Sequence, residues 1–127
     1  MIAVDTSALM AIVLDEEQAD ACIAAIGAED DLVISAGTVA EALIVSARRR
    51  IQKEVASLIE GLGFEIVSVT PAAARRVAQV YADWGKGVHP AGLNFGDCFA
   101  YDVARQHCCP LLFVGDDFAK TDIESAI

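Results

Sequence analysis

A short, wholly apolar strand that ends in a carboxylate is the feature that most constrains the fold of this chain. Residues 2–4 read Ile-Ala-Val, Asp5 follows them, and an apolar helical pattern begins directly after Thr6 and Ser7. A strand without polar alternation is typical of a parallel sheet that helices cover on both faces. Such sheets bind ligands at the carboxyl ends of their strands. The sequence therefore predicts that Asp5 lies at the functional edge of an α/β domain.

Strand and helix patterns alternate along the rest of the chain. Further strands are expected at Leu32–Ser35, Phe64–Val69 and Leu111–Val114. Polar and apolar residues partly alternate in Phe64–Val69, which places that strand near a sheet edge. Helices are expected at residues 8–14, 19–26, 38–50, 51–62, 71–84 and 95–108, whereas the tail 119–127 has no assignable pattern. The alternation predicts one domain over residues 1–127, a three-layer α/β/α sandwich with a mainly parallel sheet.

Composition points to a soluble cytoplasmic protein. No apolar run approaches the length of a membrane span, and no secretory signal pattern is present. The four cysteines are expected to be reduced thiols, because two of them are adjacent and the chain has a large core. A zinc site at His107, Cys108 and Cys109 is disfavoured because a fourth ligand at a suitable spacing is missing.

The chain is strongly acidic, with 19 acidic against 9 basic residues and a formal net charge of −10. This balance alone opposes nucleic-acid binding, because affinity for phosphate rests on clustered Lys and Arg. The local distribution of charge matters more than the sum, however. Several acids gathered in one site would need a cation to hold them together, and a basic partner could also neutralise the negative charge.

Acidic residues from distant parts of the chain adjoin strand ends or helix starts. Asp5 ends the first strand, and Asp116 with Asp117 follows the last strand. Glu41 lies one turn inside the helix after the second strand, and Asp97 lies in the first turn of the helix before the last strand. The topology lets all of these carboxylates face one edge of the sheet.

Each of these acids also has a purely structural explanation, because short polar side chains commonly cap helices and form turns. The patterns that fit are a capping box at Thr38-x-x-Glu41, another at Asn94-x-x-Asp97, a helix cap at Asp5, and a turn at Gly115-Asp116-Asp117. Taken singly, caps are the simpler interpretation. Taken together, the acids supply the hard oxygen ligands that Mg²⁺ and Mn²⁺ prefer. A site of this kind predicts metal-dependent hydrolysis of phosphodiesters.

Four stretches of the sequence, in this order, resemble the PIN domain, and more closely the VapC-type toxins of bacterial toxin–antitoxin pairs. They are Ile-Ala-Val-Asp5-Thr-Ser-Ala-Leu, Thr-Val-Ala-Glu41-Ala, Phe-Gly-Asp97-Cys-Phe-Ala-Tyr and Leu-Leu-Phe-Val-Gly-Asp116-Asp-Phe-Ala-Lys-Thr-Asp. The resemblance extends over essentially the whole chain. It implies a PIN-like α/β/α sandwich and a ribonuclease that depends on Mg²⁺ or Mn²⁺. It also implies a homodimer and a cognate antitoxin, which often inserts an arginine into the acidic site.

Residue by residue, the resemblance assigns the catalytic acids to Asp5, Glu41, Asp97 and Asp116, of which Asp5, Asp97 and Asp116 would ligate the metal. Asp117 competes with Asp116 as the fourth acid and otherwise has a supporting role. Thr6 or Ser7 matches the small hydroxyl residue beside the first acid. Many members have Ser or Thr shortly before the fourth acid, where this chain has Val114 and Gly115.

An RNA substrate directs attention to the few basic residues. Arg48, Arg49 and Arg50, followed closely by Lys53, form the one basic cluster, at the expected end of a helix where cations are favourable in any case. Lys86 lies in a loop rich in Gly and Pro. These residues are the expected RNA contacts, and a solvated helix end is the competing interpretation of the arginines.

Two other functions compete with a ribonuclease. A non-catalytic PIN-like module would use its acids as caps and act by protein contact alone. A phosphatase-like or receiver-like domain also places acids at strand ends, but the phosphatase pair needs an Asp two residues after Asp5, where Ser7 stands. A receiver would need a Lys after the last strand, where Gly115 and Asp116 stand.

Overall fold

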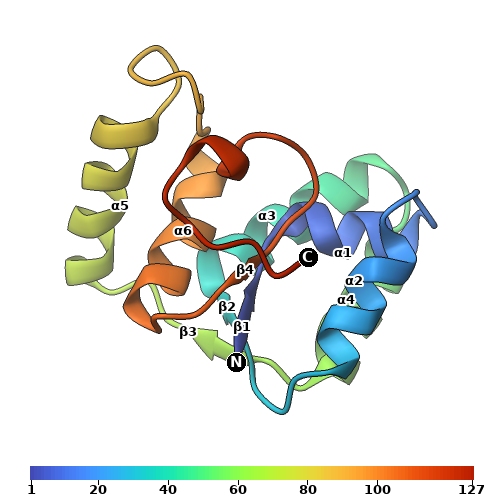
Figure 1. Cartoon of the computed structure of the whole chain (residues 1–127). Helices are drawn as coiled ribbons and strands as arrows, with labels where there is room; N and C mark the ends of the chain where they lie inside the picture. The colour runs from blue at the N-terminus through green and yellow to red at the C-terminus, as the bar shows by residue number, and fades with distance from the viewer.

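A four-stranded parallel sheet forms the centre of the computed structural model, which describes residues 1–127 (Figure 1). The strands are β1 (Ile2–Val4), β2 (Leu32–Ser35), β3 (Glu65–Val67) and β4 (Leu111–Leu112), in the order β3-β2-β1-β4. All three pairings are parallel, and Ala3 on β1 pairs with Val33 on one side and with Leu111 on the other. The predicted parallel sheet is confirmed, with β3 at an edge as expected.

Helices cover both faces of the sheet (Figure 1). They are α1 (Thr6–Val13), α2 (Ala19–Gly27), α3 (Ala36–Arg48), α4 (Gln52–Leu62), α5 (Pro71–Trp84) and α6 (Phe95–Gln106), with a short 3₁₀ helix at Phe118–Lys120. Ala3 packs in one core cluster with residues of α5 and α6, whereas its neighbours Ile2 and Val4 pack in the other with residues of α1 to α4. The apolar first strand is therefore buried on both faces, as its sequence predicts. No helix has both the length and the apolar character needed to cross a membrane.

One predicted helix boundary is wrong, and the error changes the interpretation of the site. The helix after β2 begins at Ala36 rather than near Thr38, because the Ser35 hydroxyl accepts a hydrogen bond from the Gly37 amide and caps it. Thr38 is already inside α3, where its hydroxyl is buried without a partner. The capping box expected between Thr38 and Glu41 therefore does not form.

Other differences from the sequence expectations are confined to the ends of elements. Strands β3 and β4 are shorter than the apolar runs that predict them, and α6 ends at Gln106 rather than near Cys108. The tail, which has no clear pattern, runs beside β4. There the Leu111 amide donates to the Glu124 carbonyl and the Ala126 amide donates to the Leu111 carbonyl. This pairing covers the β4 edge of the sheet, which would otherwise present unpaired backbone groups.

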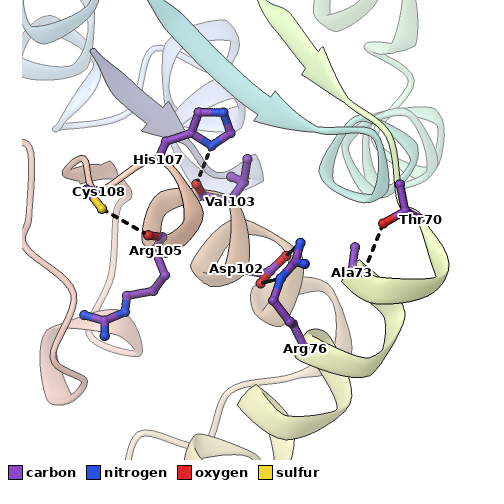
Figure 2. Close-up of polar contacts among 8 residues, drawn as sticks. All are labelled: Thr70, Ala73, Arg76, Asp102, Val103, Arg105, His107 and Cys108. Atoms are coloured by element: carbon purple, nitrogen blue, oxygen red, sulfur yellow. Dashed lines mark hydrogen bonds and ion pairs between the residues drawn. The ribbon is translucent and has the colours of Figure 1, made fainter.

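An ion pair fastens α5 to α6 (Figure 2). The Arg76 guanidinium donates to both carboxylate oxygens of Asp102, at 2.8 and 3.2 Å. The Asp102 side chain is only 11% exposed, so its charge has little access to water. The start of α5 is fixed separately, since Thr70 caps it by accepting from the Ala73 amide at 3.1 Å. These contacts hold α5 against the helix that carries Asp97.

Replacing Arg76 by Ala should lower the free energy of unfolding by clearly more than replacing Arg75 by Ala, because it leaves the nearly buried carboxylate of Asp102 without its partner. Urea denaturation measures the change. Arg75→Ala is the matched control, since Arg75 is exposed on the same helix and should change stability by no more than about 0.5 kcal/mol. The double variant Arg76→Ala/Asp102→Ala should recover part of the loss. Equal effects of Arg75→Ala and Arg76→Ala would show that the ion pair contributes nothing.

Candidate functional site

Asp5 lies at the carboxyl end of β1, buried at 3% exposure, and caps α1. Its Oδ2 accepts hydrogen bonds from the Ser7 amide at 3.1 Å and from the Ser7 hydroxyl at 2.6 Å. Its Oδ1 is buried and has no hydrogen-bond partner. The predicted cap is therefore confirmed, but it uses only one of the two carboxylate oxygens. A buried carboxylate oxygen without a partner is costly, which points to a ligand at this position.

Ser7 joins the ends of two neighbouring strands. Its hydroxyl donates to Asp5 and accepts a hydrogen bond from the Val114 amide at 3.0 Å, just after β4. The resemblance described above predicts a hydroxyl side chain shortly before the fourth acid, where this chain has Val114 and Gly115. Here the Val114 backbone makes the link, and the hydroxyl comes from Ser7. This contact fixes the segment that leads to Asp116 and Asp117.

Glu41 points toward the same edge and is held by two close contacts. Its Oε1 accepts a hydrogen bond from the Thr6 hydroxyl at 2.6 Å. Its Oε2 lies against Gly96, where an added Cβ would collide with that oxygen. Because α3 starts at Ala36, Glu41 has no capping role at this helix start. Its place beside Thr6 and Gly96 has no explanation in helix capping.

Asp97 is buried at 8% exposure and forms the predicted capping box of α6. Its Oδ2 accepts from the Asn94 amide at 2.9 Å, and its own amide donates to the Asn94 side chain at 2.8 Å. The single hydrogen bond from Asn94 does not compensate for the burial of this carboxylate. The pKa of Asp97 is raised as a result.

The pKa of Asp5 is raised to about 6. Burial is the main cause, the charge of Glu41 adds to it, and the hydrogen bonds from Ser7 act in the opposite direction. Burial also raises the pKa of Asp97 to about 7, and the nearby charges of Asp5, Asp117 and Glu41 add to the shift. Four carboxylates therefore act on one another electrostatically at this edge. Asp116 is not among the main charges acting on Asp97, and both Asp116 and Asp117 are exposed.

The donor set suits a hard divalent cation, because every side chain at this edge offers carboxylate oxygen. The free Oδ1 of Asp5 is the clearest ligand atom. In the present arrangement, no three acidic, His or Cys side chains come close enough together to hold one ion. Each of the three inner acids is instead tied to a neighbour: Asp5 to Ser7, Glu41 to Thr6 and Asp97 to Asn94. Ligation by three carboxylates would require side-chain rotation.

The predicted basic residues lie outside this cluster of acids. Arg48 ends α3, two turns beyond Glu41, and Arg49 and Arg50 follow it. Lys86 is exposed in the loop after α5. None of these four side chains contacts the site acids through a hydrogen bond or ion pair. The expected RNA contacts are therefore not part of the acidic site itself.

Gly96 is the site residue that the sequence alone does not reveal. Gly96 leaves room for the Glu41 carboxylate, and only the packing of α3 against α6 makes that requirement visible. Asn94, by contrast, is recognisable in the sequence as the helix cap, and its amide holds the carboxylate of Asp97 as the capping-box pattern predicts. A glycine directly before an acid in the first turn of a helix is the signal that could have suggested a close neighbour.

The chain matches the family model described as the PIN domain over residues 2–124. It is 41% identical to ribonuclease VapC28 of Mycobacterium tuberculosis, over 98% of this chain and 96% of the relative. It is 39% identical to the VapC ribonuclease Mb2780c of Mycobacterium bovis, over 97% of both chains.

Two solved structures share the fold at lower identity. VapC20 of Mycobacterium tuberculosis, described as a toxin that cleaves the sarcin-ricin loop, superposes with a TM-score of 0.79 at 16% identity, over 97% of this chain and 96% of VapC20. A toxin–antitoxin complex from Klebsiella pneumoniae matches with a TM-score of 0.69 at 16% identity, over 96% of this chain and 93% of the other. The family model and the curated relatives together show that the chain belongs to the PIN-domain family, among its VapC ribonucleases.

Proposed function

We propose that the protein is an endoribonuclease that depends on Mg²⁺ or Mn²⁺ and acts as the toxin of a VapBC-type pair. Its catalytic acids would be Asp5, Glu41, Asp97 and a fourth carboxylate from the loop after β4. The observation that carries the proposal is the buried Oδ1 of Asp5, which has no partner at the edge where Glu41 and Asp97 also lie. Neither a helix cap nor a core contact accounts for that oxygen.

Asp5, Asp97 and the fourth acid would hold the metal. When bound, a divalent cation would lower the pKa of a water molecule and stabilise the leaving oxygen of the phosphodiester. The Thr6 hydroxyl donates to Oε1 of Glu41 and fixes its orientation, so Glu41 is suited to orient or deprotonate the attacking water. The Ser7 hydroxyl holds Oδ2 of Asp5, which leaves Oδ1 for ligation.

Asp117 is our choice for the fourth acid, although sequence resemblance favours Asp116. The charge of Asp117 raises the pKa of Asp97, which puts Asp117 within electrostatic reach of the inner acids. Asp116 is not among the main charges that act on Asp97. In this assignment, Asp116 is an exposed turn residue next to Gly115, whose φ of 109° suits a tight turn.

A non-catalytic module is a weaker explanation of the same residues. It requires the acids to serve as helix caps, and Glu41 does not cap α3. It also gives no reason to bury both Asp5 and Asp97 at one edge of the sheet at a cost in stability. Carboxylates with strongly raised pKa values are common in catalytic sites.

A cognate antitoxin and a homodimer belong to the same proposal. The curated relatives carry VapC names, and one fold neighbour is described as a toxin–antitoxin complex. An arginine from an antitoxin could pair with the free oxygen of Asp5, because a guanidinium matches a carboxylate in shape and charge. Binding of that kind would compete with the metal for one site.

The purified chain should cleave RNA in Mg²⁺ or Mn²⁺ and stop when EDTA removes the cation. Asp97→Asn and Asp117→Asn should each lower the cleavage rate by about 100-fold or more, because each removes a charge that the reaction needs. Asp116→Asn is the matched control and should retain most of the activity. Gel analysis of labelled RNA measures the rates, and circular dichroism checks that each variant is folded.

Two results would contradict this assignment. If Asp97→Asn cleaves as fast as the unaltered chain, the site lies elsewhere. If Asp116→Asn loses activity and Asp117→Asn keeps it, the fourth acid is Asp116.

Without divalent cations, the free energy of unfolding should fall as the pH rises from about 4 to about 7. The reason is that Asp5 and Asp97 have pKa values of about 6 and about 7 in the folded chain, above the ordinary value of 3.8, so folding favours their protonated forms. Asp97→Asn should therefore stabilise the chain by about 1–2 kcal/mol at pH 8 in EDTA. The measurement is urea denaturation at several pH values.

Asp30→Asn provides the control, since Asp30 is exposed in a loop and should not alter the pH profile. Addition of Mg²⁺ should raise the stability of the unaltered chain at pH 8 more than that of Asp97→Asn. Stability that rises from pH 4 to pH 7 in EDTA would contradict the electrostatic account.

A further inference from the structure

One stripe of α3 leads from the acidic site to the basic cluster. Gly37, Glu41, Ile44 and Arg48 recur every three or four residues, so they lie along one side of the helix. Ile44, which lies between Glu41 and Arg48 on this side, is 59% exposed. Arg48 lies about 10 Å along the helix axis from Glu41, at 1.5 Å per residue.

An open hollow of about 320 Å³ lies at the start of this stripe. Its lining is mostly small or apolar and comes from α3 and α6: Gly37, Ala40, Glu41, Ile44, Phe95, Gly96 and Phe99. Phe95 is 71% exposed, more than any other large apolar side chain. Its ring meets Phe99 edge-to-face, with centroids 5.0 Å apart, so it is oriented although it is exposed. The hollow offers a flat aromatic surface directly beside Glu41.

The far end of the stripe gathers basic residues that have no acidic partners. Arg48, Arg49, Arg50 and Lys53 are exposed, and none of them belongs to the ion pairs of the structure. They are four of the nine Lys and Arg residues in a chain of net charge −10. A second hollow of about 290 Å³ lies among them, and Glu54 is the one acid in its lining. Cations left unpaired in so acidic a chain are suited to bind phosphate.

We propose that the exposed stripe of α3 binds a single-stranded segment of RNA next to the cleavage site. One unpaired base stacks on Phe95 in the hollow, and phosphates a few nucleotides away contact Arg48 and its basic neighbours. This inference rests on the proposed ribonuclease function and names the surface that holds the substrate beside the cleavage site. Proteins that bind single strands combine aromatic stacking surfaces with cations along the backbone in this way.

The order of acidic, apolar and basic residues along the stripe favours RNA over a protein partner. The apolar hollow lies between catalytic acids and unpaired cations, which matches a base lying between a reacting phosphate and later phosphates. A second copy of the chain, or an antitoxin segment, would bury the same surface and is distinguished by the experiment.

The test is fluorescence anisotropy with a labelled uridine oligomer of about 12 nucleotides, in EDTA so that nothing is cleaved. Arg48→Gln should weaken binding and reduce the salt dependence, by about 0.7 in the slope for each phosphate that the variant no longer neutralises. Arg75→Gln is the matched control, because Arg75 is exposed and unpaired on α5, and it should change the slope less. Phe95→Ala should weaken binding about five-fold or more at every salt concentration, while Phe95→Trp retains it.

Equal salt slopes for Arg48→Gln and Arg75→Gln, or unchanged affinity in Phe95→Ala, would overturn the inference. Light scattering on the same samples tests the protein alternative. If Phe95→Ala halves the molar mass, the hollow belongs to an interface between copies, which also overturns it. A chain that binds RNA as expected but never cleaves it would refute the proposed function and leave the binding stripe intact. A chain that cleaves RNA with none of these differences would refute the stripe alone.

Discussion

Burial of carboxylates at the carboxyl edge of the sheet, with a smaller contribution from the repulsion between them, is the constraint on which the site depends. Asp5 and Asp97 are buried there, and their raised pKa values measure the cost of holding charge in that place. Each buried or half-buried carboxylate accepts a hydrogen bond that partly offsets this cost. Ser7 donates to Asp5, Thr6 donates to Glu41, and the Asn94 amide donates to Asp97. The local contacts therefore orient each acid but do not neutralise the group.

The sheet topology brings the acids to one edge. Parallel pairing places the ends of β1 and β4 side by side, and the Ser7 hydroxyl joins them through the Val114 amide. Packing of α6 on α3 then brings Gly96 against Glu41. The acids come from four separated parts of the chain, so their proximity is a property of the whole sheet and not of any one motif. A site that buries several carboxylates lowers the stability of the fold, which is a frequent trade-off in enzymes.

The sequence alone accounts for most of the fold and for part of the site. The apolar strand at Ile2–Val4 and the Pro71 helix start identify the α/β pattern, because both are local signals. The position of Glu41 could not be interpreted locally. The pattern Thr38-x-x-Glu41 predicts a capping box, but Ser35 captures the helix start, and only tertiary structure shows that Glu41 meets Thr6 and Gly96 instead. Local sequence signals likewise leave Asp116 and Asp117 equivalent, and our proposal of Asp117 rests on its charge acting on Asp97 across the fold.

Carboxyl ¹³C NMR during a titration with Mg²⁺ tests the central claim most directly, because it observes the acids themselves without RNA or turnover. If the acids share one cation site, the side-chain carboxyl signals of Asp5 and Asp97 should shift together with one saturable affinity. The pKa of Asp97, about 7 in the metal-free chain, should then fall. Signals that do not respond to Mg²⁺, or an Asp97 pKa that stays near 7 at saturating Mg²⁺, would contradict the account.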